Sequence, residues 1–538
     1  MLMNKGFSYL IGNISLPFNA SVSEAFSVVK SRLKRAGLYT DDVTFSVYRR
    51  SVDARKKNDI RFVYSIIVDN VAVLLPKDRA IKLGLTPYVF EKPIVEFGAD
   101  TCKDNIVVVG SGPCGLFCSL LLAENGFKPI LIERGSAVHE RKLRVDKFIK
   151  TRVLDTDTNI QFGAGGAGTF SDGKLVTRTN DSFNNYVLSK LVEFGAPKEI
   201  LTLARPHIGT DVLLEVIDNV LRRIVTLGGR VMYNTKLLDF RTSGNRVNAV
   251  ITDKVEISCQ DLVLAIGHSA RDTQELLISK GINVEGKSFS VGMRIEHPVD
   301  VIDKGMYGDN AGNPLLGHAE YNLSYDTKNR GVYTFCMCPG GVVVPAASEV
   351  GGVVTNGMSY HSRDGRNSNS AVCCTVFKSD YGSSPLDAIK FQRDIERRAF
   401  DLAGGDFSAP IITVGDLLSD KCISHPGEVL PTYMDGKGVR LVNPSAYLPQ
   451  FVVEGLKNGI LDFDNKIRGF AMSEAVLTGP ETRTSSPVRI HRESTGLADG
   501  YYNLYPSGEG AGYAGGITSA AIDGIRTAMA IMRKYRRN

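Results

Sequence analysis

The stretch IVVVGSGPCGLFCSLLLAENGFKPILIERG, residues 106–135, constrains the fold more than any other part of this chain. An apolar strand leads into Gly110, Gly112 and Gly115, a helix follows, and a second short strand ends before Glu133. The first glycine permits a tight turn, the second lets backbone N–H groups reach a pyrophosphate, and the third lets the helix pack on the strand. The complete pattern predicts a β–α–β unit that binds a dinucleotide at the helix N-terminus.

Glu133 bears on which dinucleotide binds. A carboxylate at the end of the second strand accepts hydrogen bonds from the adenosine ribose and repels a 2′-phosphate. We therefore expect FAD or NAD at this site, and not NADP. Residues 106–123 carry no charge and could suggest a membrane span by their length. Their three glycines and one proline indicate a strand, a turn and a helix instead.

A second glycine-rich stretch, QFGAGGAGTFSDGK at residues 161–174, contains the letters of two nucleotide motifs, G-x-G-x-x-G and G-x-x-x-x-G-K. No apolar strand precedes it and no helix pattern follows it. Leu175 stands where a phosphate loop needs Ser or Thr to hold magnesium. We predict neither a second dinucleotide fold nor an NTPase loop, but a loop whose backbone comes close to a ligand.

Composition sets broad limits on the class of protein. Apolar residues make up 43% and charged residues 23% of the 538 positions, as in ordinary soluble globular proteins. The net charge of +6 is small for this length and does not by itself indicate nucleic acid. Nine cysteines lack paired spacing, and the first residues lack a continuous apolar core. We expect reduced thiols, a cytoplasmic protein, no membrane partner and no metal site.

Several longer motifs carry a resemblance to known proteins. They are ERGSAVHER, NIQFGAGGAGTFSDGKLVTR, FCMCPGG, VVTNGMS, ETRTSSPVRI and YPSGEGAGYAGGITSAA. With GSGPCGL and the acidic ERG, they make the chain resemble the FAD-binding proteins of the glutathione-reductase-like class. More narrowly, the chain resembles a family of uncharacterised bacterial FAD-dependent dehydrogenases, over most of its length. The resemblance implies bound FAD and an oxidoreductase activity, and it leaves the substrate open.

The expected fold is α/β, with a Rossmann-like FAD-binding domain built from separated segments. Residues 1–100 predict an N-terminal α+β module, and 101–284 predict the first part of the FAD-binding domain. Residues 285–484 predict an inserted, mixed α+β substrate or cap domain, and 485–538 the C-terminal part of the FAD-binding domain. Within the second segment, the run RVMYNTKLLDF, residues 230–240, is expected to form one strand.

The resemblance implies that the cofactor contacts come from all of these FAD-binding segments. Gly267 ends a strand that returns to the cofactor, Leu237 provides backbone contacts to the adenine, and Glu509 binds near the ribitol and pyrophosphate. A helix that begins near Ile517 directs its positive end at the flavin. The residues predicted to bind FAD are Gly110, Gly112, Pro113, Gly115, Glu133, Arg134, Arg141, Gly165, Gly166, Gly168, Thr169, Leu237, Gly267, Glu509, Gly510, Gly515, Gly516 and Ile517.

Two cysteines are candidates for thiol redox chemistry. Cys336 and Cys338 have C-x-C spacing, and residues i and i+2 of a strand share a face, so both could point into the site. The alternative is a pair of small core residues on a buried strand. Cys114 and Cys118 are expected to pack the nucleotide helix, and the adjacent pair at 373–374 suggests no joint site.

The other candidate catalytic residues are His268 and Arg483. His268 follows the returning strand and is a possible general acid. Arg483, with Arg489 and Glu481, predicts a polar cluster that stabilises reduced flavin or anchors a carboxylate; a structural ion-pair network is the alternative. Polar groups near the ring or the substrate mouth are expected at Asp172, Lys174 and Arg178.

The leading functional hypothesis is an FAD-dependent oxidoreductase acting on a small molecule. No second β–α–β unit with its own glycines is visible, so NAD(P)H is possible only as a transient electron donor. One alternative is a flavin-dependent RNA-modifying enzyme that uses the basic turn Arg49–Lys57. Another is a non-enzymatic flavin-binding sensor or scaffold. The oligomeric state stays open.

Overall fold

The glycine turn at 110–115 lies at the centre of a parallel sheet. The computed structural model describes residues 6–177, 181–327, 330–421 and 425–537. Five strands, all paired in parallel, lie in the order β23-β11-β5-β6-β7. They are β5 (Ile106–Val109), β6 (Ile130–Ile132), β7 (Arg230–Met232), β11 (Asp261–Leu264) and β23 (Leu504–Pro506). β6 and β11 flank β5 on opposite sides, so the direction in which successive strands are added to the sheet reverses at β5. Open parallel sheets bind ligands at the carboxyl ends of the strands beside such a reversal.

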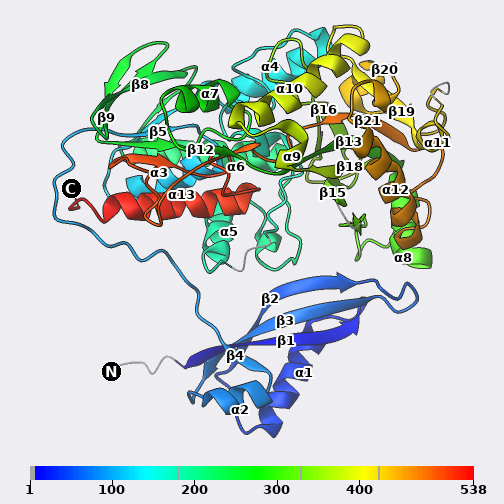
Figure 1. The fold of residues 1–538 in the computed structure, drawn as a ribbon. Coiled ribbons are helices and arrows are strands. Elements are labelled where there is room, and N and C mark those ends of the chain that lie inside the picture. The colour runs from blue at the N-terminus through cyan, green and yellow to red at the C-terminus, as the bar shows by residue number, and fades with distance from the viewer. Residues whose placement is uncertain (1–5, 178–180, 328–329, 422–424, 538) are drawn as a thin grey trace.

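Helices with small residues pack closely beside this sheet. α3 (Pro113–Glu124) connects β5 to β6 and contacts α13 (Ile517–Met532), as Figure 1 shows. A Cβ atom at Gly524 of α13 would lie 2.0 Å from the carbonyl oxygen of Cys114, so only glycine permits this approach. Cys114 and Cys118 are buried in α3, as the sequence predicted. The remaining helices of this part are α4 (Val138–Thr151), α5 (Asn184–Glu193), α6 (Thr210–Thr226) and α7 (Arg271–Ser279).

The prediction of one strand over residues 230–240 is wrong, because two strands in different sheets form there. β7 ends at Met232, and Asn234 then adopts a left-handed backbone conformation with φ of 49°. A left-handed residue turns the chain out of an extended path. The second strand joins a separate antiparallel sheet of order β10-β9-β8. Its strands are β8 (Leu237–Ser243), β9 (Arg246–Thr252) and β10 (Glu256–Ser258).

A seven-stranded sheet forms the largest part of the segment between residues 289 and 481. Its order is β14-β15-β18-β13-β21-β19-β20, and its two central neighbours β13 and β18 pair antiparallel over their whole length. The strands are β13 (Phe289–Pro298), β14 (Ser324–Asp326), β15 (Gly331–Cys338), β18 (Asn367–Val376), β19 (Ala409–Thr413), β20 (Val439–Leu441) and β21 (Val476–Glu481). Helices α10 (Pro385–Leu402) and α12 (Gln450–Lys466) pack against this sheet.

Shorter elements connect the sheets. Two antiparallel pairs lie near the boundary between the large sheets: β12 (Val284–Gly286) with β22 (Val488–Ile490), and β16 (Val342–Pro345) with β17 (Thr355–Met358). The short helices are α8 (Val299–Tyr307), α9 (Lys378–Tyr381) and α11 (Val414–Leu418). No helix in the described ranges is both long enough and apolar enough to cross a membrane.

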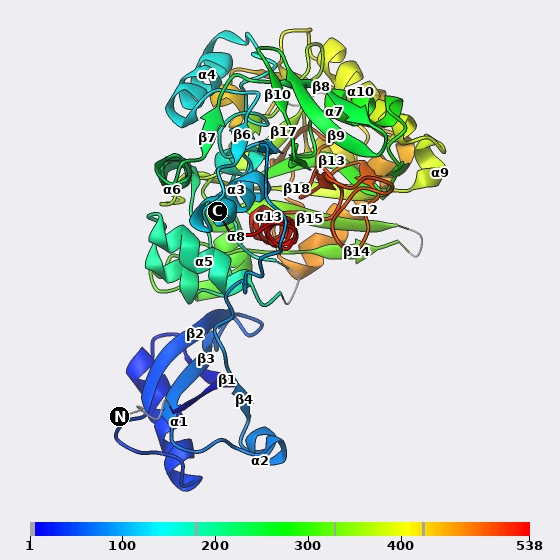
Figure 2. The same ribbon diagram turned by 90° about the vertical axis from the view of Figure 1, so that its left-hand side faces the viewer.

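The N-terminal residues form a separate module below the main body in Figures 1 and 2. Its antiparallel sheet has the order β2-β3-β1-β4, and a β–α–β–β–α–β chain of this order is the ferredoxin-like arrangement. Ala25, Val29 and Leu33 of the first helix are buried in its core. The elements are β1 (Phe7–Pro17), α1 (Val22–Arg35), β2 (Thr44–Asp53), β3 (Arg61–Val71), α2 (Lys77–Lys82) and β4 (Leu85–Pro87).

The basic turn of this module makes contacts within the chain. Arg55 pairs with Asp53 at 2.6 Å, and the carbonyl oxygen of Lys57 accepts a hydrogen bond of 3.0 Å from Asn310. Nearby, the backbone N–H of Arg50 donates to the carbonyl oxygen of Thr202. Part of the turn therefore serves to seat the module against the main body.

Candidate functional site

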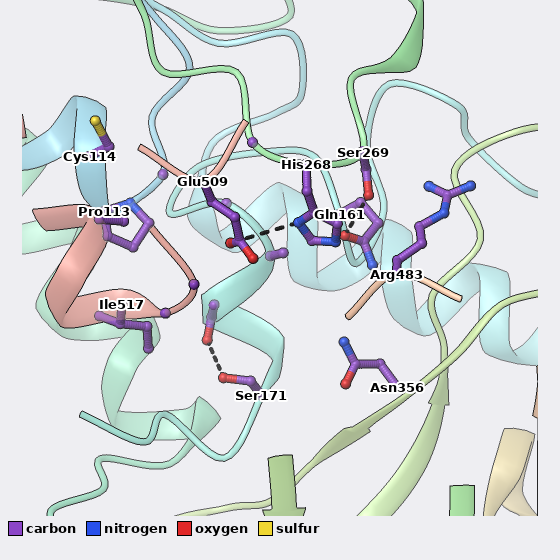
Figure 3. A pocket seen from close by; sticks show the side chains of 18 of the residues that line it. Pro113, Cys114, Gln161, Ser171, His268, Ser269, Asn356, Arg483, Glu509 and Ile517 are labelled. Atoms are coloured by element: carbon purple, nitrogen blue, oxygen red, sulfur yellow. Dashed lines mark hydrogen bonds and ion pairs between the residues drawn. The ribbon is translucent and has the colours of Figure 1, made fainter. Parts of the chain in front are cut away.

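A cavity of about 460 Å³ lies at the carboxyl edge of the parallel sheet. Its wall includes the turns that follow β5 and β11, the glycine loop at 161–176, and the start of α13. The opposite wall comes from the inserted segment and includes Phe335 and Cys336 of β15 and Asn356 of β17. Figure 3 shows side chains from these separate segments facing one another. The cavity is thus shared between the parallel sheet and the inserted segment.

The three glycines of the first motif have different surroundings. Gly110 has φ of 98°, and a Cβ there would lie 2.4 Å from the carbonyl oxygen of Ala265. A Cβ on Gly115 would lie 1.9 Å from the carbonyl oxygen of Gly110, so this position serves packing and does not line the cavity. At Gly112, the N-cap of α3, the nearest atom to a Cβ is the Cα of Gly166 at 3.8 Å. Gly112 is therefore open to the cavity.

Glu133 connects the glycine turn to the glycine loop. One carboxylate oxygen accepts hydrogen bonds from the backbone N–H and hydroxyl of Ser111, at 2.9 and 2.7 Å. The other accepts from the N–H groups of Gly135 and Gly163, at 2.9 and 3.0 Å. The side chain also lines the cavity. Its carboxylate therefore orients both backbone segments, and contact with a ribose stays a prediction.

Arg134 lies next to Glu133 on the cavity wall. Its guanidinium stacks 4.0 Å from the centre of the Phe162 ring and pairs with Asp157 and Asp272, at 2.8 and 3.0 Å. Leu237, from the start of β8, lines the same end of the cavity. These residues come together because β6, β8 and the glycine loop meet there.

Arg141 supports the glycine loop from behind and does not line the cavity. Its fully buried guanidinium donates hydrogen bonds to carbonyl oxygens of the loop, among them Asn159, Ile160 and Ala164 at 2.8 to 3.0 Å. Burial lowers the pKa of Arg141 to about 9. The sequence placed Arg141 among the cofactor contacts, whereas the structure gives it a role in holding the loop.

The glycine loop presents its backbone to the cavity at Gly166 and Gly168. Gly166 has φ of 67°, and a Cβ there would lie 2.8 Å from the Cα of Gly112, so the two glycine segments touch. Gly165 and Thr169 face away from the cavity, and a Cβ on Gly165 would lie 2.2 Å from the Thr169 hydroxyl oxygen. Only a short 3₁₀ turn, Ala167–Phe170, follows the glycines, and no α-helix does.

A buried cluster of charges lies beyond this loop. Asp172 is fully buried and is paired with Lys174 at 2.9 Å and Arg363 at 2.5 Å. Burial alone would raise the pKa of Asp172, but the two cations outweigh burial and lower it to about 2. Lys174 and Glu320 line the cavity, and Glu320 also pairs with Arg363. Arg178 lies outside the described residues.

His268 and Glu509 form an interacting pair in the cavity wall. Nδ1 of His268 lies 3.7 Å from a carboxylate oxygen of Glu509, as Figure 3 shows. Burial lowers the pKa of His268 to about 3, and nearby Arg483 and Arg271 act in the same direction. Burial raises the pKa of Glu509 to about 7, although Lys287 opposes the shift. At neutral pH the imidazole is neutral, and the carboxyl group is the one that gains and loses a proton.

The glycines around Glu509 differ in what they contact. A Cβ on Gly510 would lie 2.5 Å from the carbonyl oxygen of Gly267, so Gly510 packs and does not line the cavity. Gly515 and Gly516 line the cavity, with no atom within 4 Å of a Cβ at either position. Ile517 also lines it and begins α13. The N-terminus of this long helix therefore faces the cavity, where its partial positive charge favours an anion.

Arg483 lines the cavity but belongs to a different cluster from the one predicted. Glu396 is buried and accepts hydrogen bonds from both Arg483 and Arg271, at 3.0 and 2.7 Å. Glu481 instead pairs with Arg294 at 3.1 Å, and Arg489 lies over the Tyr513 ring. The predicted cluster of Arg483, Arg489 and Glu481 is therefore wrong. β21 ends at Glu481, so the strand geometry that would bring Glu481 and Arg483 to one face stops there.

Cys336 and Cys338 occupy different depths at the end of β15. Cys336 lines the cavity, whereas Cys338 is fully buried behind it. The strand register is interrupted between Phe335 and Cys338, and Cys336 has φ of 47°. The regular alternation expected for a strand therefore does not apply to this pair. Cys373 and Cys374 lie on β18 and are buried.

Other residues of the site carry no signal in the sequence. Gln161 is buried in the cavity wall, and its carbonyl oxygen accepts a hydrogen bond of 3.0 Å from Ser269. Its amide nitrogen has no hydrogen-bond partner among the residues that the structure describes. Asn356, Asn322 and Arg363 were likewise not identified, because their place depends on pairing between distant segments.

Sequence comparison identifies relatives over both the inserted segment and the full chain. Residues 288–484 match the family described as FAD-dependent protein, C-terminal domain-like. An uncharacterized protein of Clostridium beijerinckii (strain ATCC 51743 / NCIMB 8052) is 44% identical over 526 residues. That alignment covers 96% of this chain and 98% of the relative.

Solved structures show only distant likeness. Glycine oxidase from Bacillus cereus ATCC 14579 is 12% identical with a TM-score of 0.33, over 81% of this chain and 99% of that one. A geranylgeranyl bacteriochlorophyll reductase-like protein from Thermoplasma acidophilum is 11% identical with a TM-score of 0.36, over 81% and 79%. Because both TM-scores are below 0.5, neither likeness bears on the substrate or the reaction.

Proposed function

The chain belongs to the same family as the uncharacterized Clostridium beijerinckii protein, and we propose that it is an FAD-dependent oxidoreductase acting on a small molecule. The observation that carries this proposal is the continuous cavity that joins the glycine turn after β5 to the N-terminus of α13. The match of residues 288–484 to an FAD-dependent family supports the same cofactor.

The residues along the cavity fit FAD. Gly112 and the N-terminus of α3 would hold the pyrophosphate, with Glu133 towards the adenosine. At the other end, Gly516 and the N-terminus of α13 would face the flavin. The unpartnered amide nitrogen of Gln161, buried in the wall between, would donate to an acceptor of the cofactor. Bound there, FAD supplies two-electron redox chemistry.

Glu509 is the proton-holding residue that we propose for the reaction. Its pKa of about 7 lets it both hold and release a proton at neutral pH, as a general acid or base requires. His268 was the candidate acid from the sequence, but a pKa of about 3 keeps its imidazole neutral. His268 instead faces the Glu509 carboxyl group and orients it.

The wall formed by the inserted segment would receive the substrate. It combines the amides of Asn322 and Asn356 with the rings of Tyr321 and Phe335. Amide groups can hydrogen-bond to polar groups that carry no charge, and the rings exclude water from one side. A small, polar substrate suits this wall. RNA modification and a non-enzymatic role are not proposed, because no feature of the cavity favours either.

The first test is the absorption spectrum of the purified protein. We expect a flavin spectrum, and denaturation should release FAD in about one equivalent per chain. Anaerobic addition of NADH and NADPH, each alone, then tests the electron donor. Bleaching by one of them identifies a nicotinamide-driven enzyme, and no bleaching directs the search to oxidisable substrates. A colourless protein that does not take up FAD would contradict the proposal.

A single substitution tests where the cofactor binds. In Gly112→Val the first added carbon meets only an ordinary contact at 3.8 Å, so the fold should form, but the side chain enters the cavity. Overpacking of about 1–3 kcal/mol corresponds to FAD binding that is about 5- to 150-fold weaker. Gly12→Val, in the N-terminal sheet, is the matched control and should keep its FAD. Equal retention of FAD by both variants would contradict the assignment.

A further inference from the structure

Two thiols lie one behind the other at the wall of the cofactor cavity. Cys336 lines the cavity that also contains Glu509 and His268. Cys338 is fully buried, and its sulfur lies 3.3 Å from the carbonyl oxygen of Cys336. The S–H group of Cys338 donates to that carbonyl oxygen, which holds the buried thiol against the backbone of Cys336. A molecule in the cavity can therefore reach the first thiol directly and the second only through the first.

The backbone at this point departs from a regular strand. In a regular strand, residues i and i+2 are about 6.8 Å apart, at the upper limit of Cα distances in disulfides. β15 is not regular here, because its register with β18 is interrupted between Phe335 and Cys338. Cys336 adopts φ of 47°, which is uncommon outside glycine. This local break places the Cys338 thiol against the carbonyl group of Cys336, which straight C-x-C spacing would not do.

Two cations face the pair of thiols. The guanidinium of Arg294 is fully buried, donates to the carbonyl oxygen of Cys336, and lies 3.8 Å from the sulfur of Cys338. The ammonium group of Lys174 donates to the carbonyl oxygen of Met337, between the two cysteines. Positive charge beside a thiol favours the thiolate, which is the form that reacts with disulfides.

The other cysteines of the described segments lack this environment. Burial raises the pKa of each of them, so they are held as thiols. By contrast, the interaction with Cys338, together with Arg294 and Lys174, lowers the pKa of Cys336 to about 7 against the effect of burial. Cys338 keeps a raised pKa and retains its proton. The two thiols thus have different roles: Cys336 attacks first, and Cys338 reacts second.

We propose that Cys336 and Cys338 form a redox-active dithiol that reduces a small disulfide entering the cavity. The Cys336 thiolate attacks one sulfur of the substrate R–S–S–R, a bond from Cys336 to that sulfur forms as the substrate bond breaks, and the leaving thiolate takes a proton from water to become R–SH. Cys338 then loses its proton and attacks the sulfur of Cys336, which releases the second R–SH. The substrate gains two electrons and two protons, and the cysteine pair becomes a disulfide. The proposal rests on the proposed function, because bound FAD would supply the two electrons that reduce this disulfide back to the dithiol.

Peptide mapping of the purified, flavin-containing protein tests this step. The tryptic peptide 331–363 contains Cys336 and Cys338 and no other cysteine. The protein is reduced with dithiothreitol, desalted without oxygen, and incubated with 2-hydroxyethyl disulfide. N-ethylmaleimide then labels the remaining thiols. We expect both cysteines of the wild-type peptide to escape labelling as an internal disulfide, with release of about two equivalents of 2-mercaptoethanol.

Variants separate the two steps. Cys338→Ser should stop at a mixed disulfide on Cys336 and release one equivalent, and Cys336→Ser should release none from this peptide. Cys102→Ser is the control, because Cys102 is partly exposed but distant in the fold, and it should behave as wild type. If the serine variants do not fold, the labelling of the wild-type peptide still tests the proposal.

The outcomes distinguish this inference from the proposed function. Full labelling of both cysteines in a flavin-containing wild-type protein would overturn the dithiol and leave the oxidoreductase proposal intact. Formation of the internal disulfide in a protein that never binds FAD would support the dithiol and contradict the proposed function.

Discussion

The carboxyl group of Glu509 lies 3.7 Å from Nδ1 of His268 at the cavity wall. The two residues follow β23 and β11, which are parallel neighbours, so the carboxyl edge of the sheet brings them together. Burial moves their pKa values in opposite directions, to about 7 for Glu509 and about 3 for His268. Near neutral pH, Glu509 is therefore the residue of this pair that gains or loses a proton. That change sets the charge of this part of the cavity wall.

The stability of the protein should depend on the ionisation of Glu509. Its pKa is raised from 4.5 to about 7, so the folded state binds a proton more tightly than the unfolded state. The stabilising effect of that proton is complete below about pH 4.5 and is lost as the pH rises through about 7. Relative to Glu509→Gln, the wild-type free energy of unfolding should fall by about 3 kcal/mol over this window. Denaturant unfolding at a series of pH values measures it.

The exposed Glu454 of α12 provides the control for this series. Glu454→Gln should keep the wild-type dependence on pH, because that side chain lies in solvent. Parallel pH dependence in wild type and Glu509→Gln would show that the pKa of Glu509 is the same in the folded and unfolded states, and its assignment as the proton-holding residue would be lost.

Asp172→Asn should be strongly destabilising. The carboxylate is fully buried between Lys174 and Arg363, and its removal leaves two cations without their shared partner. Breaking a buried ion pair in this way typically costs about 3–5 kcal/mol. Asp146→Asn, which breaks an exposed pair with Lys142 on α4, should change stability by no more than about 0.5 kcal/mol. Thermal or denaturant unfolding compares them; an equal, small loss would mean that water reaches Asp172.

Arg141→Lys should loosen the glycine loop without touching the cavity. An ammonium group has three donors and cannot reproduce the fork of hydrogen bonds that Arg141 makes to the loop carbonyls. Each buried carbonyl left unpaired costs about 1–3 kcal/mol. We expect faster hydrogen exchange in residues 159–168 and weaker FAD retention. Arg222→Lys, on the exposed face of α6, is the control. Unchanged exchange in the loop would show that Arg141 does not hold it.

The sequence predicted the structure correctly where the local conformation depends only on neighbouring residues. The turn at Gly110, Gly112 and Gly115 and the helix after it follow from local sterics, and they form as predicted. The C-terminal helix also begins at Ile517, where the sequence predicted its start. In these segments the choice between strand, turn and helix is made within a few residues.

The sequence did not predict which distant segments of the chain pair with each other. The partner of Asp172, Arg363, comes from a distant part of the chain, and so does the partner of Glu481, Arg294. Nothing in the local pattern encodes which strands lie side by side in the seven-stranded sheet. The bulge at Cys336 likewise results from how β15 pairs with β18. The C-x-C spacing indicated a candidate pair, but not that one thiol faces the cavity and the other is buried.

The reactivity of Cys336 gives the last prediction. Its thiolate should react with iodoacetamide at a rate that rises with pH and levels off above about 7, where the thiol has ionised. At pH 7 an ordinary thiol with a pKa near 8.5 is only a few per cent ionised, so Cys336 should react about tenfold faster. Mass spectrometry of peptide 331–363 follows the reaction. The ionisable groups around the thiol are Cys338, Arg294, Lys174, Glu481 and Glu509.

Lys174→Gln tests whether charge sets this reactivity. Removing the ammonium group should shift the midpoint to higher pH and slow alkylation at pH 7 a few-fold, because one of the two cations that favour the thiolate is lost. Lys142→Gln, at an exposed position on α4, should leave the profile unchanged. A midpoint that stays near 7 in Lys174→Gln would assign the effect to Arg294 and Cys338 alone. A wild-type midpoint above about 8.5 would instead mean that Cys336 is an ordinary thiol, poorly suited to open a disulfide at neutral pH.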